Sequence, residues 1–293
     1  MQFLPKVKIA AALVAGLLVG LNGSVGAITI AHNGDSVDIE FVDIGYAGNT
    51  GDGAYGAVDY EYSIGKYEVT ADQWAAVIAA SSTVDTGSHP DYYTGSQPTS
   101  EVSWYEAVKF TNWLTSGDAL LGAYQFSDPY TFTGIDRDAA LITYGKIYVL
   151  PTEDEWFKAA YLKSDGSGYT LYATGDDIPI EGVDTNYGGI NFDPWIVGSG
   201  SEENNGTYDM EGNMREWTEG AHDGLLDDFS EARLLRGGGR FSTTNLFRQR
   251  ASKLPQFEQF SVGFRIASIA VPEPTSTALL ALGGVAVMMR RRR

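Results

Sequence analysis

Apolar residues recur at helical spacing in three segments, and each segment opens with a hydroxyl residue followed three positions later by Glu or Gln. These pairs are Thr70 with Gln73, Ser103 with Glu106, and Thr152 with Glu155. Such a pair forms a capping box, in which each side chain binds a free backbone N–H at the start of a helix. The pattern predicts amphipathic helices that begin at Ala71, Trp104 and Glu153. Each has a tryptophan in its first turn, which we expect in the core: Trp74, Trp104 and Trp156.

Strands are predicted to be few and short. Alternation or β-rich composition marks residues 36–44, 59–64, 147–150, 234–236 and 262–269, and the segments between them are rich in Gly, Asn, Asp and Tyr. No internal repeat and no long linker divides the chain. The pattern therefore predicts a single α+β domain with about three main helices and much irregular structure.

The composition is most informative in what it lacks. The 293 residues contain no cysteine and three histidines. Disulfides, thiolate metal sites, thiol nucleophiles and iron–sulfur clusters are thereby excluded.

Charge separates the body of the chain from its ends. Residues 28–271 hold 14 Lys and Arg against 37 Asp and Glu, a net charge of −23. A field of that sign repels nucleic acid and anionic lipid and attracts cations or basic partners. Two interpretations remain open, a solvated secreted surface and a protein that depends on a cation.

The N-terminal residues have the features of a secretory signal peptide. Residues 1–27 carry two lysines, a 13-residue apolar run and a small-residue end at Val25 to Ala27. The run is shorter than the roughly 20 residues of a membrane-spanning helix, so we expect removal and a mature start near Ile28.

The C-terminal residues resemble the PEP-CTERM sorting signal of Gram-negative bacteria. A Pro-Glu-Pro motif at 272–274 precedes an apolar stretch at 275–289 and four arginines at 290–293. The resemblance implies export and a sorting machinery that recognises this tail in the inner membrane. It places the body at the cell surface or outside the cell, with the tail as a transient or permanent anchor. An ordinary C-terminal anchor is the alternative.

Six motifs occur in the order seen in the formylglycine-generating enzyme, or sulfatase-modifying factor, domain family. They occupy residues 64–70, 102–107, 150–156, 208–218, 235–239 and 263–265. The chain resembles this family over residues 37–268. The resemblance implies a compact C-type-lectin-like α+β fold and one domain over 28–271.

The family's named activity is not expected here. It oxidises a sulfatase cysteine to formylglycine with two thiols that bind copper and lie shortly after the Arg-Gly-Gly motif. Residues 239–245 of this chain contain no cysteine. A serine hydroxyl does not replace a thiolate as a ligand for copper, so we expect neither copper nor formylglycine generation.

An alternative is a metal-dependent enzyme with a relocated site, because other members of the wider group are non-haem iron enzymes. Such a site needs two histidines and a carboxylate. The chain offers His32, His89 and His222, which have no helical spacing among them. The alternative predicts His89 or His222 beside two carboxylates.

Calcium is the expected cofactor, in a structural role. Calcium takes six to eight oxygen ligands from carboxylates and carbonyls, and residues 209–216 place acids at both ends of a Gly-Asn turn. By resemblance, one set of ligands falls on Asp209, Gly212, Met214 and Glu216. A second set falls on Asn186, Asp193 and Trp195. Alternatively, Asp209 and Glu216 cap backbone groups or pair with arginines such as Arg215 or Arg236.

The segment 240–262 is basic and aromatic within a very acidic body. Some retroelement-diversified proteins resemble this fold and vary the matching stretch to bind partners. The candidate ligand-binding residues are Arg240, Phe241, Ser242, Asn245, Arg248 and Arg250. Arginine and aromatic residues favour carboxylates or sugars. The alternative is that the aromatics belong to the core and that Arg248 and Arg250 pair with buried acids.

These features together favour an exported, non-catalytic, calcium-stabilised module that binds an extracellular polysaccharide or a protein, and not nucleic acid. A purely structural matrix protein is a further alternative.

Overall fold

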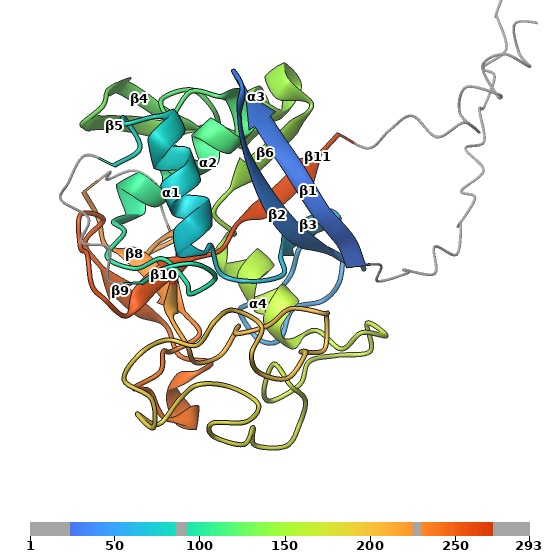
Figure 1. The fold of residues 1–293 in the computed structure, drawn as a ribbon. Coiled ribbons are helices and arrows are strands. Elements are labelled where there is room, and N and C mark those ends of the chain that lie inside the picture. The colour runs from blue at the N-terminus through green and yellow to red at the C-terminus, as the bar shows by residue number, and fades with distance from the viewer. Residues whose placement is uncertain (1–23, 86–92, 225–229, 272–293) are drawn as a thin grey trace, which may run out of the picture.

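The main sheet is a five-stranded antiparallel layer that brings the two ends of the domain together. The computed structural model describes residues 24–85, 93–224 and 230–271 (Figure 1). The order of strands in this sheet is β1 (Ser24–His32), β2 (Asp35–Ile44), β3 (Tyr62–Gly65), β11 (Ala267–Ala270) and β6 (Lys146–Val149). The C-terminal strand thus lies between strands from the first half of the chain.

The second sheet is smaller and has one parallel pair. Its order is β10 (Val262–Phe264), β7 (Arg215–Ala221), β8 (Arg233–Arg236) and β9 (Ala251–Lys253), and β10 runs parallel to β7. A separate hairpin joins β4 (Tyr124–Asp128) to β5 (Thr131–Ile135). A short 3-10 helix, η1 (Thr244–Leu246), lies between β8 and β9. The mixed α+β class with short strands is confirmed.

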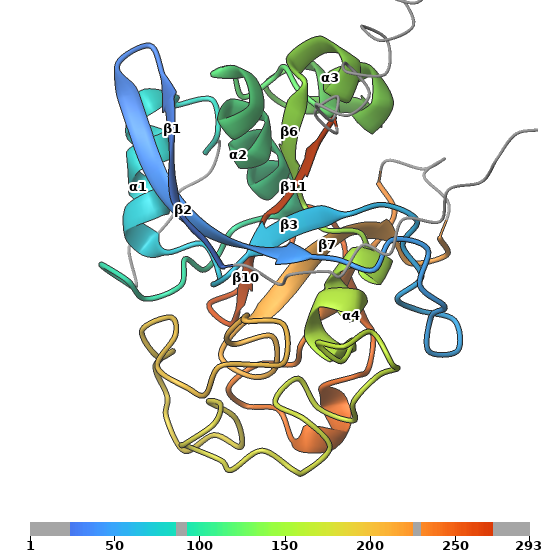
Figure 2. The ribbon, with the colours of Figure 1, turned by 90° about the vertical axis from the view of Figure 1, so that its right-hand side faces the viewer.

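All three predicted helix starts are confirmed. The helices α1 (Ala71–Ala80), α2 (Trp104–Ser116) and α4 (Glu153–Tyr161) each begin with both hydrogen bonds of the capping box. Their first-turn tryptophans are buried. Gly117 ends α2 with a φ of 81°, a left-handed conformation that glycine adopts without strain. In both ribbon views α1 and α2 lie beside the five-stranded sheet (Figures 1 and 2).

A fourth helix, α3 (Arg137–Tyr144), was not predicted. Its cap is Asp136, which accepts a hydrogen bond from Ala139 N without a reciprocal partner, and Ala140 is its one buried residue. A mostly exposed helix lacks the apolar stripe on which the prediction relied.

Two of the predicted strands are corrected by the structure. The first, over 59–64, begins only at Tyr62. The second, over 262–269, is wrong as a single strand, because the chain leaves the small sheet after Phe264 and enters the large sheet at Ala267. The break occurs where Arg265 turns its side chain into the interior.

A buried ion pair joins the two sheets at this break. Arg265 and Glu216, on β7, are both fully buried. The guanidinium donates to Glu216 through Nε at 2.7 Å and through Nη2 at 2.6 Å, and to the carbonyl oxygens of Gly65 at 3.0 Å and Tyr208 at 2.8 Å. Trp156 Nε1, on α4, donates to the same carboxylate at 2.6 Å. One side-chain pair therefore connects both sheets, α4 and the loop before β7.

Residues 163–214 form a loop half that contains no helix and no named strand. This segment occupies the lower part of both ribbon views, together with residues 237–250 (Figures 1 and 2). Side chains hold it to the rest of the domain. Asn205 Nδ2, for example, donates to the carbonyl oxygens of Ala159 at 3.0 Å and Leu162 at 2.7 Å, at the end of α4.

The predicted export segments lie largely outside the described residues. These include residues 1–23 of the expected signal peptide and the whole tail at 272–293. Residues 24–27 belong to β1 and pair with β2, so the expected mature start at Ile28 falls inside a strand. None of the helices in the described part of the chain has the length and apolar character needed to cross a bilayer.

We expect Arg265→Met to lower the free energy of unfolding by about 3–5 kcal/mol, because it leaves the buried Glu216 carboxylate without its cation. Chemical denaturation measures the change. The matched control is Arg215→Met, at a half-buried position one residue before Glu216, which should cost far less. Equal losses from the two variants would contradict the central role of the ion pair.

Candidate functional site

The candidate site is built around the turn at 209–214, whose backbone is left-handed at three positions. Asp209, Gly212 and Asn213 have φ angles of 59°, 85° and 44°. A side chain at Gly212 would place a Cβ 2.5 Å from the Asn186 carbonyl oxygen, so the close approach requires glycine. Gly212 N donates to Gly237 O at 2.9 Å, and Asn213 N donates to Asn186 O at 2.8 Å. The turn is thereby fixed to two distant segments.

Glu68, from the segment between β3 and α1, is the residue of this site that the sequence did not reveal. It is buried, and its two oxygens accept hydrogen bonds from Met214 N at 2.9 Å and Asn213 Nδ2 at 2.7 Å. It lies within the motif at 64–70, yet no local spacing links it to a turn 145 residues away.

The structure brings the second predicted calcium set together around the Asn213 side chain. Asn213 Oδ1 accepts a hydrogen bond from Trp195 N at 2.8 Å, and Asn186 Nδ2 lies 3.4 Å from the Asp193 carbonyl oxygen. Asn186 is fully buried, and its Oδ1 has no hydrogen-bond partner. A buried amide oxygen without a partner is a ligand of the type that calcium favours.

The first predicted set is only partly available to a cation. Asp209 is buried, with Oδ2 accepting a hydrogen bond from Gly198 N at 2.9 Å and Oδ1 without a partner. The Glu216 carboxylate, in contrast, is taken by Arg265 and Trp156. Pairing with an arginine was the alternative for Glu216, but its partner is neither Arg215 nor Arg236.

Side chains alone do not form a metal centre in the described part of the chain, which contains no cluster of three or more His, Asp or Glu placed to hold an ion. Backbone carbonyls would have to complete any cation site. Calcium at Asp209, Gly212, Met214 and Glu216, or at Asn186, Asp193 and Trp195, stays a prediction.

Negative charge is concentrated behind the turn. Burial, followed by the charges of Asp209 and Glu216, raises the pKa of Glu68 well above its usual range. Burial also raises the pKa of Asp209 to about 6 and that of Glu203 to about 8, and the charge of Arg265 opposes both shifts. These carboxyl groups therefore share one guanidinium, and a proton or a cation would relieve their repulsion.

The predicted ligand-binding residues do not form one surface. Arg248 pairs with Asp52, donates to Thr170 O at 2.6 Å and covers the ring of Tyr161. Arg250 Nε lies 2.9 Å from Glu153 Oε1, an oxygen that also pairs with Arg236. Both arginines therefore pair with acids near the start of α4 and in the loop at Asp52, but Asp52 is exposed and Glu153 half-buried, whereas the alternative interpretation named buried acids.

Arg240 and Phe241 lie elsewhere. Arg240 is buried, and it donates to the carbonyl oxygens of Phe192 at 2.6 Å and Phe260 at 3.0 Å. Phe241 is 46% exposed. Ser242 is buried and accepts a hydrogen bond from Gly239 N at 3.0 Å through Oγ, and Asn245 is exposed on η1. Of the predicted set, Phe241, Asn245 and Arg250 are exposed.

The histidines provide no evidence for an iron site. His32 packs edge-on against Trp113, and its Nε2 lies 3.1 Å from Leu114 O. His222 is exposed, and its backbone N–H donates to Ala232 O at 2.9 Å. His89 lies outside the described residues.

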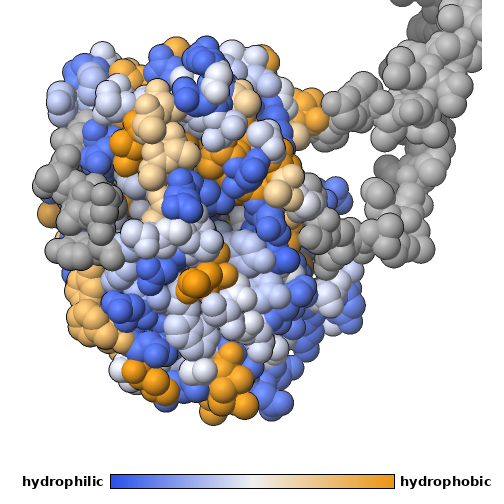
Figure 3. All heavy atoms as spheres, viewed as in Figure 1, coloured by the Kyte–Doolittle hydropathy of each residue, from blue (hydrophilic) through white to orange (hydrophobic). Residues whose placement is uncertain are grey.

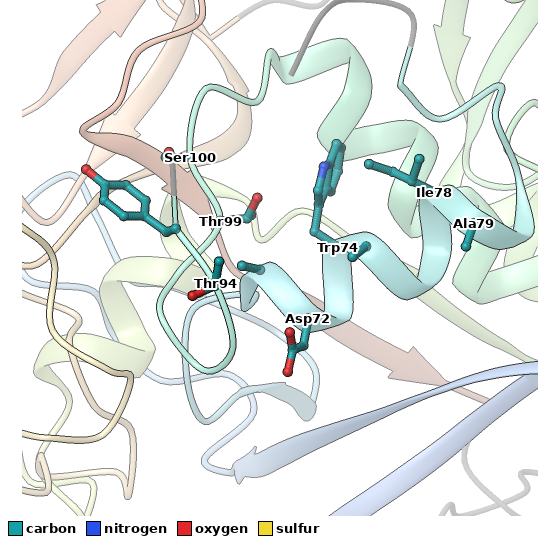
Figure 4. Close-up of a pocket in the computed structure, with 10 residues that line it drawn as sticks. Asp72, Trp74, Ile78, Ala79, Thr94, Thr99 and Ser100 are labelled. Carbon is teal, nitrogen blue, oxygen red and sulfur yellow. The ribbon is translucent and has the colours of Figure 1, made fainter. Parts of the chain in front are cut away.

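A cavity of about 410 Å³ lies against α1 (Figure 4). Trp74 and Ile78 form part of its wall, with Asp72, Thr94 and Thr99. Thr99 Oγ1 is buried and has no hydrogen-bond partner. None of the predicted site residues lines this cavity.

The sulfatase-modifying factor enzyme 1-like domain model matches residues 55–270. The chain belongs to this family. The match starts after β2, so it does not test the expected boundary at residue 28. A PEP-CTERM protein-sorting motif matches residues 270–293, which implies a sorting machinery as a partner and suggests export with membrane-associated sorting.

The chain is 29% identical over 208 residues to a protein of Paenibacillus barcinonensis named chaperone protein LppX; the match covers 63% of this chain and 71% of that protein. Two solved structures show the same fold. Treponema denticola variable protein 1 has a TM-score of 0.58 at 23% identity, covering 82% of this chain and 98% of its own. PvdO from Pseudomonas aeruginosa has a TM-score of 0.56 at 19% identity, covering 85% and 99%.

Glu203→Gln should make stability less dependent on pH. The pKa of this carboxyl rises from its ordinary value of 4.5 to about 8 in the fold because of burial. Its contribution to stability is therefore complete below pH 4.5 and is lost as the pH rises toward 8. The amide can keep both present contacts, with Met210 N and Thr207 Oγ1.

We expect the stability of Glu203→Gln relative to wild type to increase by roughly 1 kcal/mol per pH unit across this window. Thermal melts at several pH values measure the trend. Glu202→Gln, at the exposed neighbouring position, is the control and should run parallel to wild type. A parallel curve for Glu203→Gln as well would contradict the raised pKa.

Proposed function

We propose that this protein is an exported, non-catalytic binding module whose site loops are stabilised by calcium. The observation that carries the proposal is the pair of orphaned buried oxygens, Asn186 Oδ1 and Asp209 Oδ1. Asp209 belongs to the 209–214 turn, and Asn186 lies in a segment to which that turn is hydrogen-bonded. A buried oxygen without a hydrogen-bond partner lowers the stability of the fold. A hard cation would coordinate such an oxygen and offset the local negative charge.

Asn186 and the carbonyl oxygens of Asp193 and Trp195 would hold one ion, and Asp209 with the carbonyls of Gly212 and Met214 would hold another. Bound there, calcium supplies charge neutralisation and cross-links the loops. Glu216 is the weakest member of the proposed set, because Arg265 already occupies its carboxylate.

The absence of catalysis is proposed from the chain's own residues. The full sequence contains no thiol. In the segment 239–245, which would carry the family's two cysteines, Ser242 accepts a hydrogen bond from Gly239 N, and Phe247, just after this segment, is buried. Redox chemistry of the family type needs sulfur ligands. The chain keeps the family's fold and its long loops, which hydrogen bonds hold in place.

Binding is the function that such a scaffold can serve. One relative is named a chaperone and one structural neighbour a variable protein, names that agree with contact to other molecules more than with one conserved reaction. The proposed ligand is an extracellular polysaccharide or protein that contacts the loop half near Phe241. The sorting tail would deliver the module to the cell surface.

Calcium at a concentration 100-fold above its Kd should stabilise the protein by about 2.7 kcal/mol. For a domain of this size the melting temperature then rises by about 5–10 °C. Melts of the purified protein in excess calcium and in chelator measure the shift, and metal analysis measures the bound ion. Asn186→Ala and Asp209→Ala should each reduce the shift, whereas Asn245→Ala, at an exposed position, should leave it intact. A chelator-insensitive melt would remove the calcium proposal.

The binding function predicts retention of at least one ligand on arrays of bacterial exopolysaccharides and extracellular proteins. Phe241→Ser should weaken that signal about tenfold, because an exposed aromatic ring at an interface contributes on the order of 1–2 kcal/mol. Leu121→Ser, at an exposed position away from the loop half, is the control. The proposal fails if aldehyde forms in a sulfatase peptide incubated with this protein, since the module would then be catalytic.

A further inference from the structure

The loop half exposes an unusual number of large apolar side chains. Of the fifteen large hydrophobic residues that are exposed in the described part of the chain, seven lie between residues 171 and 196. Figure 3 shows several apolar side chains, separated by more polar ones, over this lower part of one face. Scattered apolar residues need no explanation, but a group this dense on a monomer indicates an interaction surface. We call six exposed residues, five from this segment and one from the segment after β8, the apolar face: Ile178, Ile180, Val183, Ile190, Phe192 and Phe241.

One ring contact lies within the group, and two of its members lie close to glycines of the loop half. The Ile190 side chain lies 3.5 Å from the position of a Cβ on Gly182, next to Val183. The Phe241 ring lies 3.8 Å from the corresponding position on Gly189, next to Ile190. The rings of Phe192 and Phe241 are 5.8 Å apart, and Phe260 adjoins both. The phenylalanine rings therefore join residue 192 to the segment after β8, and the four aliphatic residues are grouped with them by exposure and by closeness in the sequence.

The backbone beneath the apolar face is fixed, although it has no regular structure. Asp184 Oδ2 accepts a hydrogen bond from Ile180 N at 2.7 Å. Gly189 N donates to Arg240 O at 2.8 Å, and Arg240 Nε donates to Phe192 O at 2.6 Å. These bonds hold the exposed side chains in place before a partner arrives, which lowers the ordering cost of binding.

The charge around the apolar face is mainly negative, with Arg240 over the Phe241 ring and Lys163 paired with Asp176 at 3.7 Å as basic exceptions. Residues 164–214 contain ten Asp and Glu and no Lys or Arg. Asp176 and Asp177 immediately precede Ile178, Glu181 follows Ile180, and Asp193 follows Phe192. A partner for this surface must bury apolar groups and tolerate, or neutralise, a strongly negative rim.

We propose that the apolar face docks a protein segment in which apolar side chains are flanked by lysine or arginine. This inference rests on the proposed binding function and narrows its partner to a basic, apolar protein surface. A second copy of the chain would bring two acidic rims together, and anionic lipid would be repelled. Sugars stack on aromatic rings, whereas four of the six side chains here are aliphatic and offer no hydrogen bond.

The location of the apolar face fits a partner outside the membrane. Both ribbon views place the loop half opposite the end where β11 leads to residue 271 (Figures 1 and 2). The last described residue, Val271, donates its N–H to Gly145 O at the end of α3. A tail that holds the chain at a membrane therefore leaves the apolar face accessible.

The test measures binding of the full-length protein to a synthetic 14-residue leucine–lysine peptide by fluorescence anisotropy. The double variant Ile180→Ser, Phe192→Ser should weaken the Kd at least tenfold. The matched control is Leu121→Ser, Ile142→Ser, which alters equally exposed residues away from the loop half and should bind as wild type does. All of these residues are exposed, so the variants should retain the wild-type fold, which circular dichroism checks.

A charge variant completes the test. Asp177→Asn, Glu181→Gln should weaken binding of the leucine–lysine peptide several-fold and reduce its dependence on salt. A peptide with glutamate in place of lysine, and one with serine in place of leucine, should bind at least tenfold more weakly than the original.

Four results would overturn the inference: unchanged peptide affinity in the double variant, equal affinity for the glutamate peptide, binding of phosphatidylcholine vesicles through the same residues, or self-association that the double variant abolishes. If the protein does not bind the leucine–lysine peptide but retains an array ligand through other residues, the inference fails and the proposed function as a binding module remains. If neither probe binds, both are lost.

Discussion

The ion pair of Arg265 and Glu216 is the interaction on which the rest of the architecture depends. Both groups are fully buried, and every polar atom contributed by Arg265 has an acceptor on a different segment of the chain. Buried charges are tolerated only when they are paired and fully hydrogen-bonded. The pair therefore determines where the C-terminal chain changes sheets. It also decides which acid is unavailable to a cation, because Glu216 cannot bind a guanidinium and an ion with the same oxygens.

Local patterns in the sequence were reliable where the structure depends on neighbours along the chain. The three capping boxes each need residues three positions apart, and all three helices begin as expected. The strand over 262–269 failed for the opposite reason. Its division is imposed by Glu216, 49 residues earlier, and no periodicity within the segment reports that contact.

In the candidate site, too, the sequence reveals some residues and misses those whose partners lie far along the chain. The family resemblance grouped Asn186, Asp193 and Trp195, and the structure places Asn186 and Trp195 against Asn213 and Asp193 against Asn186. It could not supply Glu68, whose partner is far along the chain, nor separate Arg240 from Arg248. Arg248 has its charge partner at Asp52, 196 residues away. Basic and aromatic composition describes a binding surface and an internal clamp equally well, and only tertiary contacts distinguish them.

The loop half shows how an irregular region can be held in place without the hydrogen bonds of a β-sheet. Side-chain amides and guanidinium groups donate to its backbone, carboxylates accept from it, and bonds between backbone groups close its turns. The apolar side chains that it carries point outward and contribute little to the interior. Mutational drift at those positions would therefore leave folding largely undisturbed, so the same frame could acquire new recognition properties quickly. For protein engineers, the frame is a natural starting point for randomised libraries.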